Sequence, residues 1–205
     1  MTCIVGFKTP KGVILGGDSA GVCPTTLEAS VIKHPKVFVR PPYVIGYSGS
    51  FRLGQVLEYD FVPPEPTKED RRDLMRFMVS KFVPKLRSAI SDGGVAVVSG
   101  TMEFAGNFLV GVCDRLFEIQ DNFQIIEVAG RYNAIGVGSM FALGAMHLAD
   151  GAGLAKQDPV WAVRASLEAA AEHSVAVRPP FTVVQGEPAH PAKAARKKKK
   201  NGGKK

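Results

Sequence analysis

The sequence has few cysteines. It contains only Cys3, Cys23 and Cys113, which lie far apart in a chain of 205 residues. No Cys-x-x-Cys pair or Cys/His cluster accompanies them, so the pattern indicates neither a zinc site nor a disulfide framework. Sparse, unpaired cysteines are typical of a reducing compartment, and we therefore expect a cytoplasmic protein.

Long apolar runs and nucleotide motifs are missing as well. No stretch approaches the roughly 20 apolar residues of a membrane-spanning helix, and the N-terminus does not resemble a signal peptide. Gly136-Val137-Gly138 lacks the third glycine of a dinucleotide-binding loop, and the four histidines have no metal-ligand spacing. We expect no cofactor and no metal, so any ATP dependence would have to come from a partner.

The positive charge of the chain is concentrated at one end. The formal net charge is +7, yet residues 190–205 hold eight cations and no acid, which leaves 18 basic and 19 acidic residues elsewhere. The sequence therefore predicts one folded domain over residues 1–188 and a disordered Lys-rich tail over 189–205. Such a tail could make weak, nonspecific contacts with nucleic acid, and a merely solubilising role is the alternative.

Hydrophobic periodicity and turn residues predict strands first, then helices, then strands and helices again. A helix over residues 67–89 is expected to begin with a cap formed by Thr67 and Asp70, and Pro84 is expected to kink it or end it early. The predicted strands are residues 2–8, 13–18, 36–39, 43–47, 107–113, 116–120, 123–128, 132–137 and 181–185, and the other predicted helices are 50–60, 139–149 and 159–174.

This order of elements favours an α+β fold over a doubly wound parallel sheet. Two mainly antiparallel sheets, each with a helix pair outside it, would satisfy the order. The prediction is a four-layer αββα sandwich.

The residue after the initiator methionine is chemically informative. Threonine is small, and the initiator methionine is commonly removed before small residues, which would give Thr2 a free α-amine. An α-amine titrates near pH 8, so a neutral fraction exists at pH 7 and can accept the hydroxyl proton of Thr2. The alternative is that Thr2 simply opens the first strand.

Four segments favour the catalytic interpretation because of their order and spacing. They are Thr2–Gly6, Gly12–Ser19, Lys36–Phe38 and Val44–Gly49, with weaker support from Ala134–Ser139. Together they resemble the N-terminal-nucleophile (Ntn) hydrolases, above all proteasome β subunits and HslV. The resemblance covers most of residues 2–185 and implies the same αββα sandwich.

The resemblance also implies roles for individual residues. Thr2 matches the nucleophile, Asp18 the acid that ends the second strand, and Lys36 the lysine before an apolar pair. A lysine cation beside Thr2 would favour loss of the hydroxyl proton, and Asp18 would hold that lysine charged. Gly49 matches the position whose backbone N–H faces the developing oxyanion.

Several positions depart from the family pattern. Val137 stands where the family usually has a serine in a Gly-Ser-Gly turn, and Ser139, two residues on, is the candidate to replace it. The segment between Asp18 and Lys36 is about two residues longer than usual, which leaves Lys33 as a rival for the lysine role. The acidic or polar support that the family has later in the chain finds no clear match around Glu172-His173-Ser174. Cys3 is expected to be a packed thiol, because strand alternation places it opposite Thr2.

The function that the resemblance implies is a threonine peptidase in a homo-oligomeric ring, acting on polypeptides and served by an ATP-dependent unfoldase. Two alternatives stay open at this stage. One is a catalytically silent structural subunit of the same fold, and the other is an Ntn amidase that acts on a small molecule.

Overall fold

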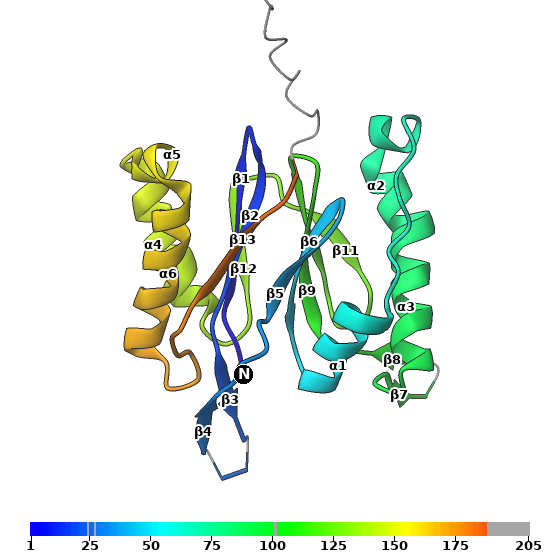
Figure 1. The fold of residues 1–205 in the computed structure, drawn as a ribbon, viewed down its shortest axis with the longest axis horizontal. Helices are drawn as coiled ribbons and strands as arrows, with labels where there is room; N and C mark the ends of the chain where they lie inside the picture. The colour runs from blue at the N-terminus through cyan, green and yellow to red at the C-terminus, as the bar shows by residue number, and fades with distance from the viewer. Residues whose placement is uncertain (24, 27, 101, 188–205) are drawn as a thin grey trace, which may run out of the picture.

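The computed structural model describes residues 1–187 apart from 24, 27 and 101 (Figure 1). The predicted boundary at residues 188 and 189, and the Lys-rich tail after it, lie outside the described residues. Within the described part of the chain, no helix combines the length and the apolarity that crossing a membrane requires.

The first sheet carries the N-terminus. Its four strands run in the order β12 (Tyr132–Ile135), β1 (Ile4–Thr9), β2 (Gly12–Gly17) and β13 (Thr182–Gln185), and every neighbouring pair is antiparallel. Strands β1 and β2 form a hairpin in which Ile4 is paired with Gly17. The residues just before β1 therefore lie beside the residues just after β2.

The second sheet has five antiparallel strands. Their order is β11 (Ile125–Glu127), β10 (Arg115–Ile119), β9 (Asn107–Val112), β6 (Tyr43–Ser48) and β5 (Val37–Arg40). Two short hairpins are separate from both sheets, namely β3 (Ala20–Val22) with β4 (Ala29–Val31), and β7 (Val97–Ser99) with β8 (Met102–Phe104). The chain end marked N lies close to the β3–β4 hairpin (Figure 1).

The helices form two groups. The first group is α1 (Phe51–Gln55), the π-helical η1 (Val56–Asp60), the 3-10 turn η2 (Asp70–Arg72), α2 (Leu74–Phe77), the π-helical η3 (Met78–Phe82) and α3 (Val83–Asp92). The second group is α4 (Ser139–Gly151), α5 (Leu154–Gln157) and α6 (Pro159–His173).

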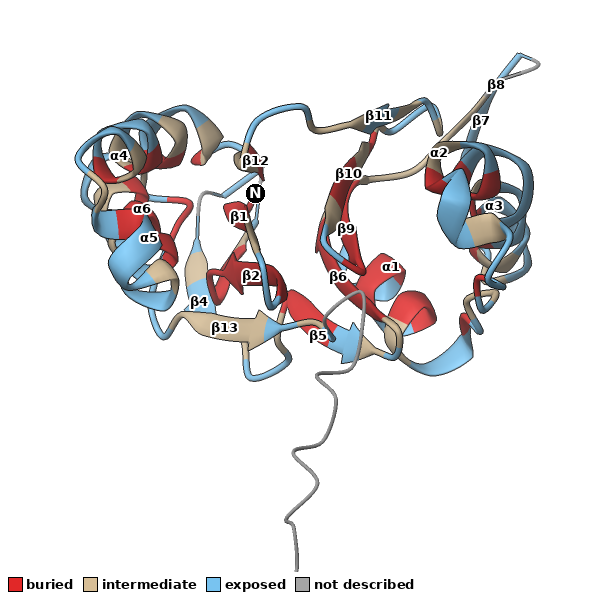
Figure 2. Cartoon of the chain, turned by 90° about the horizontal axis from the view of Figure 1, so that it is seen from above, coloured by how far each residue is buried: buried red, intermediate tan, exposed pale blue. Residues whose placement is uncertain are grey.

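Successive side chains at the start of the chain point to opposite faces of the first sheet, so they contribute to two different parts of the hydrophobic core. Cys3, Val5 and Phe7 pack with α4 and α6, whereas Ile4 packs with residues of the second sheet. The two sheets thus face each other, α4–α6 cover the outer face of the first, and α1–α3 cover the outer face of the second (Figure 2). A residue before β1 on the Ile4 side, such as Thr2, lies at the edge of the space between the sheets.

The predicted class is confirmed as a mixed α/β structure with antiparallel sheets and helices. All nine predicted strands occur, and most of their bounds shift by one or two residues at each end. The β3–β4 and β7–β8 hairpins and helix α5 were not predicted, because their three- or four-residue runs are too short for a periodic signal.

The prediction for residues 67–89 was wrong about where the helix begins, and of the two alternatives for Pro84 the early end does not occur. Thr67 and Asp70 do exchange hydrogen bonds, but these close only a short turn, and the helix begins later, where the side chain of Asp73 accepts from the backbone N–H of Arg76. Pro84 does not end the helix. It occupies the first turn of α3, directly after the wider π-helical turn η3, where a missing N–H is tolerated.

Candidate active site

Thr2 is buried at the start of the first sheet, with 2% of its surface exposed. Its hydroxyl donates a hydrogen bond of 2.5 Å to the carbonyl oxygen of Met1. The Met1 side chain is itself 41% exposed, so the first residue leads from the buried threonine to the surface.

An ion pair lies next to Thr2. Asp18 follows β2, Lys36 precedes β5, and the Nζ of Lys36 lies 3.0 Å and 3.1 Å from the two carboxylate oxygens. Both side chains are almost completely buried. Burial of either charge alone would cost several kcal/mol, so each depends on the other for compensation.

Backbone groups complete the surroundings of this pair. The Asp18 carboxylate accepts hydrogen bonds from the backbone N–H of Cys3 at 2.9 Å and of Ala20 at 2.8 Å. The Lys36 ammonium donates to the Ala20 carbonyl oxygen at 2.7 Å and to the Met1 carbonyl oxygen at 3.4 Å. One oxygen atom, that of Met1, thus accepts from both Lys36 and Thr2.

The site disfavours positive charge on amines. Burial lowers the pKa of Lys36, while the Asp18 carboxylate acts in the opposite direction. The pKa of the Met1 amino group is also lowered, first by burial and then by the Lys36 cation, again against Asp18. The Met1 amino group is therefore more often neutral at pH 7 than a free chain terminus.

Lys36 and not Lys33 is at the site. Lys33 is exposed, whereas Lys36 is buried against Asp18. Cys3 is packed against α4 and α6, and burial raises its thiol pKa to about 12, so it is the packed thiol that strand alternation predicts.

A glycine turn between β12 and α4 closes around the backbone of Thr2. Gly136 has a φ of +90°, and a β-carbon there would lie 2.2 Å from the Thr2 carbonyl oxygen. The N–H of Gly138 donates to the same oxygen at 3.3 Å. Only glycine fits at 136, both for its backbone angle and for the space available. Val137, between them, is half exposed.

The two remaining predicted residues lie at the margin of the cluster. Gly49 is exposed between the end of β6 and α1, and it is joined to the site through Ser48, whose hydroxyl lies beside Gly136. Ser139 is the first residue of α4, and its N–H donates to the Gly136 carbonyl oxygen at 3.1 Å. Among the described residues, no hydrogen bond joins the Ser139 side chain to Thr2.

Sequence reasoning missed two buried or half-buried serines at the site. Ser19 follows Asp18, and its hydroxyl donates to the Pro180 carbonyl oxygen at 2.5 Å, which ties the end of β2 to the segment before β13. Ser48 lies two residues beyond Gly46 in β6. The sequence signal that could have found them is their position, because Ser19 directly follows Asp18 and Ser48 directly precedes Gly49.

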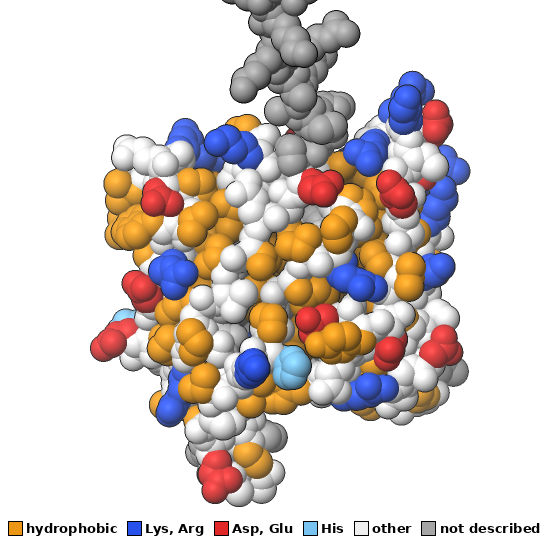
Figure 3. Space-filling view, viewed as in Figure 1, with side chains coloured by type: hydrophobic (Ala, Val, Ile, Leu, Met, Phe, Trp, Pro, Cys, Tyr) orange, Lys and Arg blue, Asp and Glu red, His pale blue; other side chains and the backbone are white. Residues whose placement is uncertain are grey.

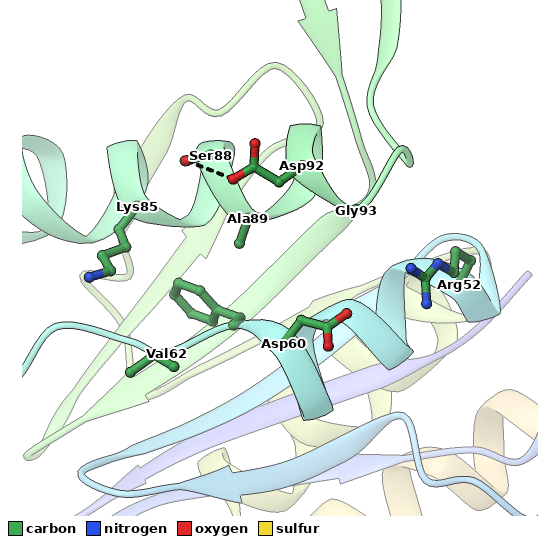
Figure 4. A pocket seen from close by; sticks show the side chains of 9 residues that line it. Arg52, Asp60, Val62, Lys85, Ser88, Ala89, Asp92 and Gly93 are labelled. Atoms are coloured by element: carbon green, nitrogen blue, oxygen red, sulfur yellow. Dashed lines mark hydrogen bonds between the residues drawn. The ribbon is translucent and has the colours of Figure 1, made fainter.

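Other features of the surface do not involve Thr2. A cavity of about 480 Å³ lies between α3 and the segment after η1, with Arg52, Asp60 and Lys85 on its walls (Figure 4). None of its lining residues belongs to the Thr2 cluster. In the described part of the chain, no three His, Cys, Asp or Glu side chains are grouped as metal ligands.

The structure thus combines two facing sheets, helices outside each of them, and a buried Asp-Lys pair beside Thr2. The chain has the proteasome-type fold of the Ntn hydrolases. No protein-family model matches the sequence, and comparison with curated proteins found no match.

The solved structures that are similar to this chain include the following three. BPH of Thiobacillus denitrificans, a bacterial proteasome homologue solved in complex with epoxomicin, has a TM-score of 0.68 and 17% identity, over 90% of this chain and 98% of that chain. Eukaryotic HslV of Trypanosoma brucei has a TM-score of 0.59 and 17% sequence identity, and the match covers 90% of this chain and 99% of that chain. An Anbu Gly-1 mutant from Hyphomicrobium sp. strain MC1 has a TM-score of 0.59 and 15% sequence identity, and the match covers 91% of this chain and 82% of that chain.

Proposed function

We propose that the protein is an N-terminal threonine peptidase, with Thr2 as nucleophile after removal of Met1. The observation that carries this proposal is the contact of Thr2 and Lys36 with the same oxygen of Met1, with Asp18 paired to the lysine. Removal of Met1 would leave the new α-amine of Thr2 near the Lys36 cation. The four-layer αββα arrangement implied for the fold agrees with the packing of its helices and sheets.

The chemistry follows from these groups. Thr2 Oγ1 attacks a peptide carbonyl carbon while its proton passes to the α-amine, and Lys36 stabilises the developing negative charge on Oγ1. Collapse breaks the C–N bond, and the α-ammonium returns the proton to the leaving amine. Water then attacks the resulting ester, with the α-amine again taking the proton, and Thr2 is released. Gly49 would supply a backbone N–H to the oxyanion in both steps.

The test uses epoxomicin, because the similar BPH structure holds that compound. Intact mass and N-terminal sequencing should show removal of Met1 and one adduct on Thr2, and the adduct should be absent in Thr2→Ala. Retention of Met1 without an adduct, under conditions that modify a control threonine peptidase, would overturn the proposal.

We also propose that the protein is a homo-oligomer, with a ring as the expected form and a cytoplasmic location in keeping with its free cysteines. Exposed apolar side chains on and beside α4 support self-association: Val137, Met140, Leu148 and Leu154 are each at least 43% exposed. Hydrophobic side chains gather over the α4–α6 side of the molecule (Figure 3). Exposed apolar patches of this kind commonly mark protein interfaces. Polypeptides would be the substrates, and an ATP-dependent unfoldase would be a further partner.

The replacement of the turn serine by Val137 supports one alternative, a catalytically silent subunit that keeps the fold. Complete Met1 removal with no reaction at Thr2 would favour it. An Ntn amidase would react at Thr2 but cleave small amides rather than peptides.

A further inference from the structure

Ser48 faces the space between the two sheets. Tyr47, its neighbour in β6, points to the helix side, since a β-carbon at Gly54 of α1 would meet the Tyr47 ring at 2.1 Å. Gly46 points the other way, because a β-carbon there would lie 2.6 Å from Ile4 of the first sheet. Residues two apart in a strand share a face, so Ser48 points toward the first sheet. Ile4 is two residues from Thr2, and Ser48 is two residues from Gly46.

Gly136 locates the Ser48 hydroxyl relative to Thr2. The position of a β-carbon at Gly136 is 2.2 Å from the Thr2 carbonyl oxygen and 3.3 Å from Ser48 Oγ. The two oxygens therefore border the same small space. Ser48 is half-buried, and none of the hydrogen bonds among the described residues uses its hydroxyl. The group is thus available to a ligand, to water or to a new chain terminus.

The turn beside Thr2 has no hydroxyl of its own at its centre. The side chain of Val137 cannot form hydrogen bonds and is half exposed. Ser48 lies on the opposite sheet, and its hydroxyl lies beside Gly136. It therefore places a hydroxyl next to the turn of residues 136–138, whose central side chain is apolar.

We propose that Ser48 is a positioning residue that orients the α-amine of Thr2, and this inference rests on the proposed function. Its hydroxyl accepts a hydrogen bond from the amine, directly or through one water, and so fixes rotation about the Cα–N bond with the lone pair toward Oγ1. A hydroxyl acceptor binds an ammonium more strongly than a neutral amine. Ser48 therefore holds the pKa of the Thr2 amine higher than it would otherwise be.

The experiment measures the rate of epoxomicin modification of Thr2 from pH 5.5 to 9.5 in the full-length protein. Variants are Ser48→Ala, Ser48→Cys and the double variant Ser48→Ala with Val137→Ser. Ser50→Ala is the matched control, because Ser50 caps α1 two residues away by accepting from the Leu53 N–H at 3.1 Å. Circular dichroism and melting establish that each variant is folded.

We expect Ser48→Ala and Ser48→Cys to react up to about tenfold more slowly on the high-pH plateau, the loss expected for a hydrogen bond that orients the neutral amine, with the pH midpoint moved to lower pH. Ser50→Ala should keep the wild-type midpoint. Val137→Ser should restore part of the rate in the double variant. A rate loss with no change in midpoint would indicate a disturbed Gly49 oxyanion site and would overturn the proposal.

The outcomes separate this inference from the proposed function. If the wild-type protein forms no adduct, the proposed function fails and the role of Ser48 with it. If the wild type reacts and Ser48→Ala matches it in rate and midpoint, the positioning role is wrong while the peptidase proposal stands. Should Ser48→Ala fail to fold, Ser48→Cys, which keeps the branching of the side chain and replaces the hydroxyl by a weaker hydrogen-bonding thiol, decides the question in the same way.

Discussion

Asp18 and Lys36 form an ion pair of 3.0 Å that is almost wholly removed from solvent, although 17 residues and the β3–β4 hairpin separate them in the chain. The carboxylate also accepts from the backbone on both sides of the site, at Cys3 and Ala20. The same contacts that hold the lysine charged therefore also fix the backbone around Thr2. The proposed reactivity of Thr2 would therefore depend on a pair that also stabilises the fold.

Replacing Asp18 by alanine should destabilise the fold strongly. The change leaves a buried lysine without its counter-ion and two backbone N–H groups without acceptors, for which about 3–5 kcal/mol is expected. Urea unfolding checks this value. Adding Lys36→Met should recover part of the loss, whereas Glu103→Ala, which breaks the exposed pair with Arg87, should change little. Equal losses for Asp18→Ala and Glu103→Ala would contradict the argument.

The rate of Thr2 modification should rise with pH to a plateau. The midpoint of this rise should lie below the pKa of a free α-amine. In the proposed mechanism the neutral Thr2 amine is the reactive base, and we expect burial and Lys36, which lower the pKa of the Met1 amino group, to act on it in the same direction. A midpoint below about 7.7, the lower value for a free α-amine, is the expected outcome. Lys36→Met removes one cause of the lowering, so its slower reaction should have a midpoint at higher pH. A midpoint unchanged by Lys36→Met would show that the lysine does not act on the amine.

Replacing Thr2 by serine should retain modification, and replacing it by alanine should abolish it. Serine keeps the hydroxyl and the α-amine, while alanine loses the nucleophile. Both side chains are no larger than threonine, so the buried position should accommodate them. Intact mass after epoxomicin treatment checks the pair. An adduct on Thr2→Ala would place the nucleophile elsewhere.

Alanine at Gly136 should disrupt the site, and alanine at Gly144 should not. A β-carbon at Gly136 would lie 2.2 Å from a backbone oxygen at a positive φ, so the turn around Thr2 would have to move. Gly144 lies within α4 with open space around it, and alanine there should stabilise the helix by roughly 0.5–1 kcal/mol. Melting temperatures and modification rates of the two variants give the comparison. Full reactivity of Gly136→Ala would show that the turn does not support Thr2.

Deleting residues 189–205 should remove binding to nonspecific DNA without affecting Thr2. The deletion takes away eight cations and leaves a body of net charge −1. Fluorescence anisotropy with a labelled duplex should show binding by the full chain that weakens steeply with salt. Equal binding by the truncated chain would locate the contact on the folded body.

Local sequence was sufficient for the elements that carry the proposed nucleophile. Apolar runs and turn residues predict the β1–β2 hairpin, and antiparallel pairing then brings residue 2 next to residue 18. Lys33 lies three positions from Lys36 and would face the other way in an extended strand, which favours Lys36 for the lysine role, and Lys36 is the one buried against Asp18. The hairpin prediction succeeds because strand period and hairpin register are short-range properties.

Tertiary structure alone decided the rest of the site. Gly136 reaches Thr2 from more than 130 residues away because β12 pairs with β1, and Ser48 reaches it because the two sheets face each other. Neither contact leaves a periodic signal, since each depends on how whole sheets stack rather than on neighbouring residues. The sequence by itself determined which strands form and which residue opens the first one. The packing of the two sheets decided which backbone turn and which hydroxyl surround that residue.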